Sequence, residues 1–400
     1  IRDSSVTGVQ TCALPISFAA NTSGEQNTGI GVGVFANNTT GSYNTGVGYF
    51  AGVSNTTGGA NTAMGWDALY SNTTANNNVA LGYQAGYANQ TGGDNTFIGA
   101  GAGPATTSSF NTMVGSGSGR VNTTGAYNTF VGGRNSDGYS VAYSNTTGSS
   151  NAFVGSGVAA NNTTGSYNTA LGTSALYANT TSSSNVAVGY QAGYSLTGAS
   201  NTIYGYQAGY SITGNGNVCL GYATGATGTS LTSGSNNTYV GNQVSASAGS
   251  VQYEIVLCAS ASGVTGKGGS TGFISPNGGG VYQGNNSSSW STTSDQRLKK
   301  NIVDNNDGLS KINAIRVRNF EYRLPEEVDA ELKPTDAINK TGVQLGVIAQ
   351  ELQQVLPECV KQESTGVLSV DPDNLTWYLV NAVKQLSAEV ESLKSQLKGA

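Results

Sequence analysis

Two residues near position 300 place a hydroxyl and an amine at a spacing that could support peptide-bond chemistry. Ser294 and Lys299 are five positions apart, so their side chains could meet across one turn. The chain has no histidine, which excludes Ser-His-Asp and Cys-His catalysis and histidine-based metal sites. A lysine amine can instead act as the base for a serine nucleophile when burial lowers its pKa. On spacing alone, however, a Ser-Asp turn start followed by a solvated lysine is the commoner arrangement.

The stretch Ser294–Ile302, called here the hinge motif, contains this pair. It resembles the first motif of the intramolecular chaperone domain that ends phage endosialidases and many tail fibres, a family also classed as self-cleaving serine peptidases. Asn319–Tyr322 and Gly346–Glu351 extend the resemblance, which covers residues 294–400.

The resemblance implies a single-turnover cleavage of the Thr293–Ser294 bond and no other catalysis. Ser294 would be the nucleophile and Lys299 the base. Asp295, Arg297 and Asn301 also match the motif of the family, but their roles remain open between orientation and structure.

Composition divides the chain at the hinge motif. Glycine accounts for 58 of 400 residues, and charged residues for only 10%, whereas globular domains usually have about a quarter. The basic residues before position 291 are Arg2, Arg120, Arg134 and Lys267, so the first part lacks the basic patch that nucleic acid requires. No apolar run is long enough to cross a bilayer. We therefore expect neither nucleic-acid binding nor membrane insertion.

The first sixteen residues have a separate interpretation. Val6–Ile16 reads as the in-frame translation of a common sequencing adapter. We expect residues 1–16 to be an assembly artefact and the native N-terminus to be missing, and we discount Cys12. The cysteines form no CxxC pair and no disulfide framework, and we expect no metal and no cofactor.

A repeat of about 17 residues occupies positions 17–242. It recurs from Asn27 to Asn237 with the pattern Asn-Thr-x-Φ-Gly, in which Φ is usually an apolar residue. This pattern predicts a short strand closed by a glycine with positive φ. A fixed period of this length is typical of a solenoid, in which neighbouring units bury one another. We expect thirteen coils in one stack, with an insertion after Asn128 that loops out.

Strand alternation predicts which residues fill the coil interior. Because successive residues of a strand point to opposite faces, we expect Φ and the Thr two positions earlier to face inward. The residue between them would then form an exposed apolar strip: Ala63, Ala80, Phe97, Met113, Phe130, Phe153, Ala170, Ala187, Ile203, Cys219 and Tyr239. An exposed apolar strip of this length marks an interface. A homotrimer with the strip toward its axis would bury it, and the repeats resemble a longer version of the head repeats of trimeric autotransporter adhesins.

The Asn and Thr columns leave alternatives open. Stacked Asn side chains can form hydrogen-bonded ladders along a solenoid. Asn38-Thr39-Thr40 and Asn72-Thr73-Thr74 also fit the N-glycosylation pattern. Regular Thr with low charge is also typical of ice-binding solenoids. The turns lack the Asp residues of calcium-binding nonapeptide repeats, so we expect no ladder of metal ions.

Residues 243–293 break the period and predict a β-rich connector. Strands are expected over Val251–Leu257 and in the stretch Gly272–Tyr282, around a glycine-rich turn.

Residues 294–400 predict a small α+β domain. One short helix is expected to start near Gly308, and another is expected to end just before Pro357. Asp371-Pro372 starts a terminal helix over 372–398. Six apolar residues of this helix have the 4-3-4-3-4 spacing of a coiled coil: Leu379, Val383, Leu386, Val390, Leu393 and Leu397. We expect them to form a trimerisation seam.

Together these features predict a mainly β, homotrimeric chain, with a β-solenoid or β-roll stalk followed by an α+β chaperone domain that ends in a coiled-coil helix. We expect a phage tail fibre or spike on the virion that attaches to a host receptor or glycan, trimerises through its chaperone domain and cleaves itself before Ser294. One alternative is a trimeric adhesin on the bacterial cell surface with a non-cleaving trimerisation domain. Another is an ice-binding solenoid. Glycan hydrolysis is disfavoured because the repeats contain no close carboxylate pair.

Overall fold

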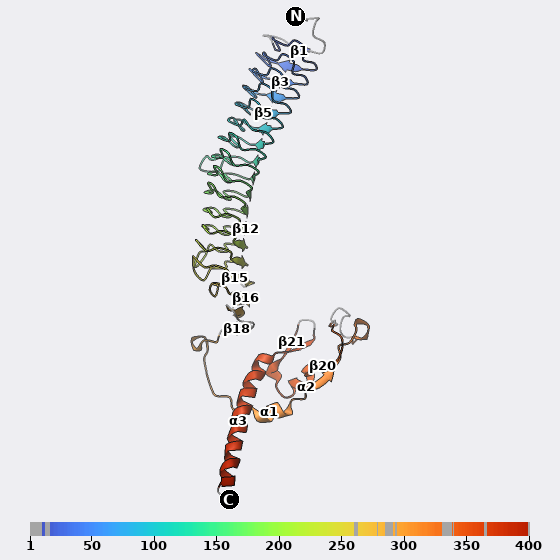
Figure 1. The fold of residues 1–400 in the computed structure, drawn as a ribbon, viewed down its shortest axis with the longest axis vertical. Coiled ribbons are helices and arrows are strands. Elements are labelled where there is room, and N and C mark those ends of the chain that lie inside the picture. The colour runs from blue at the N-terminus through green and yellow to red at the C-terminus, as the bar shows by residue number, and fades with distance from the viewer. Residues whose placement is uncertain are drawn as a thin grey trace. The chain divides into compact units, whose positions relative to one another are not determined.

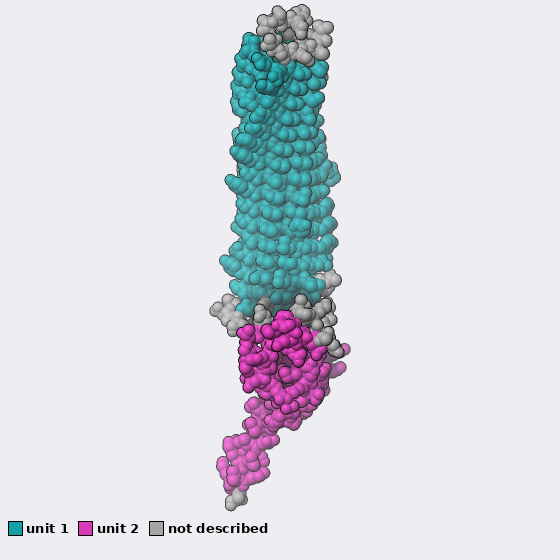
Figure 2. Space-filling view, turned by 90° about the vertical axis from the view of Figure 1, so that its right-hand side faces the viewer, with its two compact units in different colours: residues 1–294 teal, residues 295–400 magenta. Residues whose placement is uncertain are grey.

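The structure, a computed structural model, describes residues 10–12, 17–259, 263–277, 279–284, 291–292, 294–329, 338, 340–363 and 366–398. The chain forms two compact units, residues 1–294 and 295–400 (Figure 2). Thr293 and most of residues 1–16 lie outside the described residues, so the predictions that concern them are not addressed by the fold.

The first unit is a β-solenoid in which every repeat contributes one three-residue parallel strand (Figure 1). Neighbouring strands pair residue for residue, for example Thr45 with Thr62 and Val47 with Met64. The predicted solenoid is therefore confirmed. The repeat strands are β2 (Thr28–Ile30), β3 (Thr45–Val47), β4 (Thr62–Met64), β5 (Val79–Leu81), β6 (Thr96–Ile98), β7 (Thr112–Val114), β8 (Thr129–Val131), β9 (Ala152–Val154), β10 (Thr169–Leu171), β11 (Val186–Val188), β12 (Thr202–Tyr204), β13 (Val218–Leu220) and β14 (Thr238–Val240).

The stack extends beyond the repeats at both ends. β1 (Gln10–Cys12) pairs in parallel with β2. After β14, the parallel order continues through β15 (Ile255–Cys258) and β16 (Gly272–Asn277). β17 (Gly279–Gln283) and β18 (Ser291–Thr292) then pair antiparallel. Thr238 pairs with Ile255, and Ile255 pairs with Gly272, each 17 residues further on. The change of sequence at residue 243 is thus a change of composition, and the coils keep their length across it.

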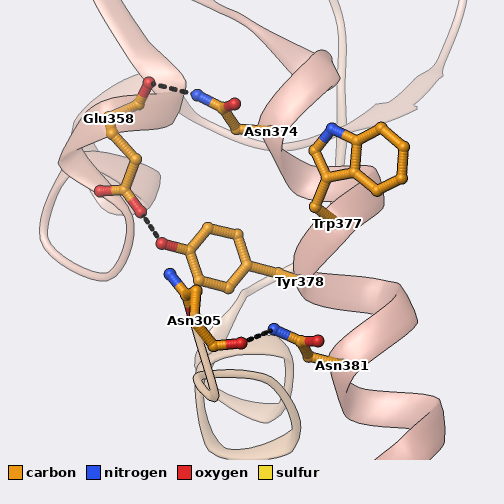
Figure 3. Close-up of a pocket in the computed structure, with 6 residues that line it drawn as sticks. All are labelled: Asn305, Glu358, Asn374, Trp377, Tyr378 and Asn381. Carbon is orange, nitrogen blue, oxygen red and sulfur yellow. Dashed lines mark hydrogen bonds between the residues drawn. The ribbon is translucent and has the colours of Figure 1, made fainter. Parts of the chain in front are cut away.

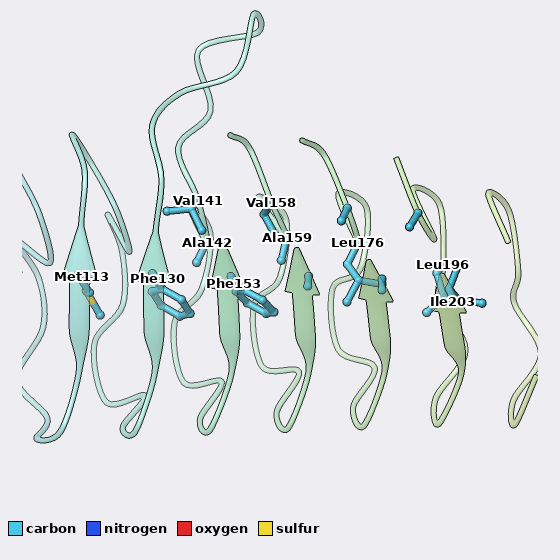
Figure 4. Packing of buried hydrophobic residues seen from close by; sticks show 14 of the residues in the cluster. Met113, Phe130, Val141, Ala142, Phe153, Val158, Ala159, Leu176, Leu196 and Ile203 are labelled. Atoms are coloured by element: carbon cyan, nitrogen blue, oxygen red, sulfur yellow. The ribbon is translucent and has the colours of Figure 1, made fainter. Parts of the chain in front are cut away.

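Glycine closes each strand because the next coil lies against it. Gly48 has a φ of +136°, and a Cβ on it would lie 2.6 Å from the carbonyl oxygen of Gly65. No side chain fits at that distance between stacked backbones, which explains why the position after Φ is always glycine. The insertion after Asn128 leaves the stack intact, because β8 and β9 pair directly (Figure 4).

The interior of the solenoid is lined by the middle residue of each strand, so the predicted assignment of the two strand faces is wrong. Phe130 and Phe153 are fully buried and lie inside the coil (Figure 4). Φ residues such as Ile30 and Leu171 are exposed. The reason is the Asn before each strand. It faces inward to form hydrogen bonds, and alternation from that Asn places the middle residue inside and Thr and Φ outside.

Two asparagine ladders stabilise the coil interior. In the first, the backbone N–H of each opening Asn donates to the side-chain oxygen of the Asn one coil earlier, as Asn44 does to Asn27 at 2.9 Å. In the second, the Nδ2 of Asn55 donates to Oδ1 of Asn38 at 2.7 Å, and Asn72 repeats this contact with Asn55. The ladder interpretation is therefore confirmed. Asn38 and Asn72 are buried, so the folded coil does not present their amides for glycosylation.

Glu254 ends the first ladder. Its backbone N–H donates to Asn237 Oδ1 at 2.8 Å, as an Asn would at that position. Its buried carboxylate accepts from Tyr239 Oη at 2.7 Å, from the N–H of Ser247 at 3.1 Å and from the N–H of Gly268 at 2.7 Å. Burial and the hydrogen bond to Glu254 raise the pKa of Tyr239, which stays a neutral donor. An Asn side chain would bring an NH2 group to this position, whereas the Glu254 carboxylate only accepts. The carboxylate therefore suits a site where the three groups that contact it all donate.

The second unit is a small α+β fold that ends in a long helix (Figure 1). Two antiparallel pairs form its sheets, β19 with β20 and β21 with β22. Its only fully buried apolar cluster among the described residues is Leu352, Leu356 and Cys359. The elements are η1 (Gln296–Leu298), α1 (Leu309–Ala314), β19 (Arg318–Phe320), η2 (Pro325–Glu327), β20 (Gln344–Gly346), α2 (Ala349–Gln353), η4 (Pro357–Cys359), β21 (Val360–Gln362), β22 (Leu368–Val370) and α3 (Pro372–Lys398).

Candidate functional site

The hinge motif folds into a single 3-10 turn, η1, that is stabilised by its own residues. Asp295 is the N-cap, and its Oδ1 accepts from the backbone N–H of Arg297 at 2.9 Å. The Arg297 guanidinium returns to the same carboxylate, with Nη2 2.6 Å from Oδ2 and Nε 3.0 Å from Oδ1. These bonds hold the pKa of Asp295 below its usual value. Asp295 and Arg297 therefore shape the turn between Ser294 and Lys299.

Asn301, the last but one residue of the hinge motif, has a φ of +55°. Among residues with a side chain, Asn adopts this left-handed conformation at low cost. Asn at this position therefore fits the backbone conformation that follows η1.

Ser294 and Lys299 flank η1, and both are exposed in the single chain. The backbone N–H of Lys299 caps the turn by donating to the carbonyl of Gln296 at 3.0 Å. The neighbouring apolar residues are also open to solvent, and Val303 is 85% exposed. One chain thus presents the two groups on the surface, without the buried surroundings that a lysine base requires.

The terminal helix α3 holds the segment that follows the hinge motif. Asn381 Nδ2 donates to the carbonyls of Asn305 at 2.7 Å and Asp307 at 3.0 Å. Gln385 Nε2 donates to the carbonyl of Asn306 at 2.6 Å, and its Oε1 accepts from the N–H of Leu309 at 2.6 Å. Two amide side chains of α3 therefore satisfy the irregular backbone just before α1.

A shallow pocket forms where α3, η4 and the Asn305 segment meet (Figure 3). The Tyr378 hydroxyl donates to the Glu358 carboxylate, and Asn381 reaches Asn305 from the next turn of α3. The bond from Tyr378 lowers the pKa of Glu358. The hydrogen bonds of Asn374, Tyr378 and Asn381 hold α3 against η4 and the Asn305 segment. Trp377 also lines the pocket and is exposed.

Ion pairs also join β19 to α2 and β21 to the start of α3. Arg318 on β19 donates to both oxygens of Glu351 on α2, at 2.7 and 3.1 Å. Lys361 on β21 bonds to the Asp371 carboxylate at the start of α3. Both carboxyl groups have pKa values below their usual range because of these hydrogen bonds.

The predicted coiled-coil residues all lie on the exposed surface of α3. Exposure runs from 40% at Val390 to 79% at Leu397, and Leu379, Val383, Leu386 and Leu393 lie between. The only buried residue on α3 is Ala382, which contacts the segment at Gly308. One chain therefore leaves this apolar seam uncovered.

Within the described residues, no three His, Cys, Asp or Glu side chains cluster as metal ligands would. The helices found there are also too short or too polar to span a bilayer.

Comparison with known proteins finds similarity in the C-terminal part of the chain. Residues 294–361 match the family described as chaperone of endosialidase. The chain is also 36% identical, over 108 residues, to the long tail fiber protein Gp37 of Enterobacteria phage K3 and equally to that of Enterobacteria phage T2. These matches cover 26% of this chain but only 8% and 7% of the two tail fiber proteins. The resemblance of the C-terminal region to this chaperone family is thereby confirmed.

The hinge motif and the helix seam could be found from the sequence, but the contacts of Gly308, Asn381 and Gln385 could not. Their contacts join segments more than seventy positions apart. The sequence did offer one signal for these contacts. Asn381 and Gln385 are two amide residues four positions apart on a helix that also carries the coiled-coil seam.

Proposed function

We propose that this chain is part of a phage tail fibre or spike, a solenoid shaft followed by a chaperone domain that assembles it. The match at residues 294–361 supports this proposal most strongly, and the similarity to two long tail fiber proteins agrees with it. In this proposal the solenoid serves in attachment of the virion to a host-cell receptor or glycan.

The chaperone domain assembles three chains through α3. Its buried core is only a few residues, whereas the seam from Leu379 to Leu397 is open to solvent. Burying such a seam against two other helices supplies stability that one chain lacks. It also aligns three slowly folding solenoids in register. Light scattering should give a trimer for the full chain, whereas a chain lacking 374–400 should be monomeric or aggregated.

The assembled domain then cleaves its own chain. Ser294 Oγ attacks the carbonyl carbon of Thr293 while Lys299 Nζ takes the hydroxyl proton. The bond from that carbon to the nitrogen of residue 294 breaks, and the departing nitrogen takes the proton back. An ester now joins the Thr293 carbonyl to Ser294 Oγ, and water hydrolyses it. Because both groups are exposed in one chain, the enclosure that activates Lys299 forms on assembly, so cleavage follows trimerisation.

Intact-mass analysis tests this scheme. Purified chain should yield two fragments, residues 1–293 and 294–400, and the second should begin Ser-Asp-Gln-Arg. A folded trimer that stays intact would instead favour a domain that only trimerises, as in the adhesin-like alternative.

One observation favours the ice-binding alternative. The Thr column faces outward on a parallel sheet, as Thr28, Thr45 and Thr62 show. The column is interrupted by Val79, Ala152 and other apolar residues, however, and such a role leaves the chaperone domain unexplained. Thermal hysteresis measured on the purified solenoid would support the ice-binding alternative.

A further inference from the structure

We propose that the outward strand face of the solenoid is the surface along which three copies of this shaft associate side by side. This inference rests on the proposed trimer and identifies the surface that the trimer buries. The face consists of four columns of residues, counted from the opening Asn of each repeat. They are the residue before the Asn, the Thr after it, the Φ residue, and the residue two positions after Φ.

Exposed large apolar residues of the solenoid gather on this face. Among described residues 17–258, Val121 and Tyr139 are the exceptions. The residues on the face are Ile30, Tyr43, Tyr49, Met64, Trp66, Tyr83, Phe110, Tyr127, Val154, Tyr167, Leu171, Val186, Tyr190, Tyr204, Tyr206, Tyr222, Tyr253, Ile255 and Leu257. An apolar strip of this kind on one side of a rod marks an interaction surface.

Backbone conformation gives independent support. Tyr43, Phe110, Tyr127 and Tyr167 precede the opening Asn and have φ values near +60°. Other coils place Asn77 or Gly216 in this column, residues that adopt such a conformation at lower cost. Phe110 and Tyr127 stack on each other within the chain, with ring centroids 4.9 Å apart. Tyr43 and Tyr167 are 61% and 70% exposed, and a contact from another chain would offset the cost of their backbone conformation.

The charge and size of the face fit another copy of the same chain. No strand from β2 to β14 contains an acidic or basic residue, and Asp94 is the one charged residue in the four columns of these coils. Asn77 Nδ2 donates to its carboxylate at 3.1 Å, and identical faces otherwise meet without charge repulsion. Thirteen coils at about 4.8 Å each, and a width of about 15 Å, give a face of about 900 Å². A standard interface buries about 800 Å² on each partner.

The face also continues beyond the repeats. The Φ column runs on through Leu257, Ile274 and Val281, which are paired in register and remain exposed. Three chains started in parallel by their α3 helices place the same coil at the same height, so each row meets its own copies.

The aromatic rows are arranged differently from a sugar-binding platform. Tyr206 stacks on Tyr190 with ring centroids 5.2 Å apart, and Tyr222 stacks on Tyr206 at the same distance. Neighbouring rings cover one another's faces, and a sugar needs a free ring face. The row Tyr190, Tyr206 and Tyr222 therefore presents ring edges, which suit packing against another aromatic column.

Short-range cross-linking of the full chain tests this proposal. Tyr204→Cys places a thiol on the face, where Tyr204 is 59% exposed, and Thr181→Cys places one on an exposed turn outside it. With a short bis-maleimide, which joins two thiols, Tyr204→Cys should give covalent dimers of the shaft on a denaturing gel, at least tenfold more than Thr181→Cys or the wild-type chain.

Light scattering on the same samples separates the two ways in which the test can fail. Trimers in which Tyr204→Cys cross-links no better than Thr181→Cys would overturn the face assignment and leave the trimer standing. Monomers would refute the proposed assembly itself.

Discussion

Gly308 lies so close to α3 that a Cβ on it would be 2.5 Å from the backbone nitrogen of Ala382. This contact brings the segment after the hinge motif onto the helix that carries the trimerisation seam, and the amides of Asn381 and Gln385 fix it there. The helix that is proposed to gather three chains thus also determines the path of the chain next to Ser294.

Gly308→Ala should loosen this contact, because backbone on α3 cannot move aside as a side chain would. We expect the C-terminal unit to lose about 1–3 kcal/mol, the usual cost of overpacking. Thermal unfolding and hydrogen exchange of α3 would measure the loss. Gly284→Ala is the matched control, since a Cβ there meets nothing within 4 Å. Equal stability of the two variants would show that Gly308 is not a required contact.

Asn168→Ala should destabilise the solenoid by about 1–3 kcal/mol, because it leaves buried partners without hydrogen bonds. Asn168 Oδ1 accepts from the N–H of Asn185 at 3.0 Å, and its Nδ2 donates to the carbonyl of Ser182 at 2.9 Å. The melting of β-structure followed by circular dichroism would show the effect. Asn37→Ala, at an exposed position, should leave the melting temperature unchanged. A neutral Asn168→Ala would argue against the ladder as a source of stability.

Glu254→Gln should also weaken the solenoid, at its C-terminal end. Three donors face this carboxylate, and an amide would turn an NH2 group toward at least one of them. We expect a loss of about 1–3 kcal/mol, seen as faster hydrogen exchange in residues 237–275. The exposed Glu25→Gln provides the control. Unchanged exchange in Glu254→Gln would show that the site does not require a carboxylate.

Acid should loosen the C-terminal unit before the solenoid. Hydrogen bonds from Arg318 and Lys361 lower the folded-state pKa values of Glu351 and Asp371. A lowered pKa contributes stability above the unfolded-state value, and this stability is lost as the pH falls through the folded-state value. Hydrogen exchange should therefore rise in residues 295–398 below about pH 4, while residues 27–240, which contain few acids, stay protected. Loss of protection in the solenoid first would contradict this order.

The strands and their period could be predicted from the sequence because the Asn-Thr-x-Φ-Gly pattern marks both each strand and the glycine that ends it. The inward face could not be read from hydrophobicity, since both faces are apolar. The buried Asn decides it, through hydrogen bonds to neighbouring coils such as that from Asn44 to Asn27. The inward Gly29 and Gly46 were a second signal, because Phe18 and Phe35 fill the space beside them.

The hinge motif was visible as a pattern, but its internal structure was not. The Asp295–Arg297 pair and the positive φ of Asn301 depend on how the turn folds. The contacts of α3 with residues 305–309 depend on distant segments meeting, which local patterns do not encode.

Intact mass of the purified trimer, compared between the wild type and Ser294→Ala, tests the central claim most directly. The account predicts that the wild-type chain divides into residues 1–293 and 294–400, while Ser294→Ala, Lys299→Ala and Lys299→Arg stay full-length trimers, because arginine cannot act as the base. Cleavage at the same bond in Ser294→Ala, or a folded wild-type trimer that remains intact, would contradict it.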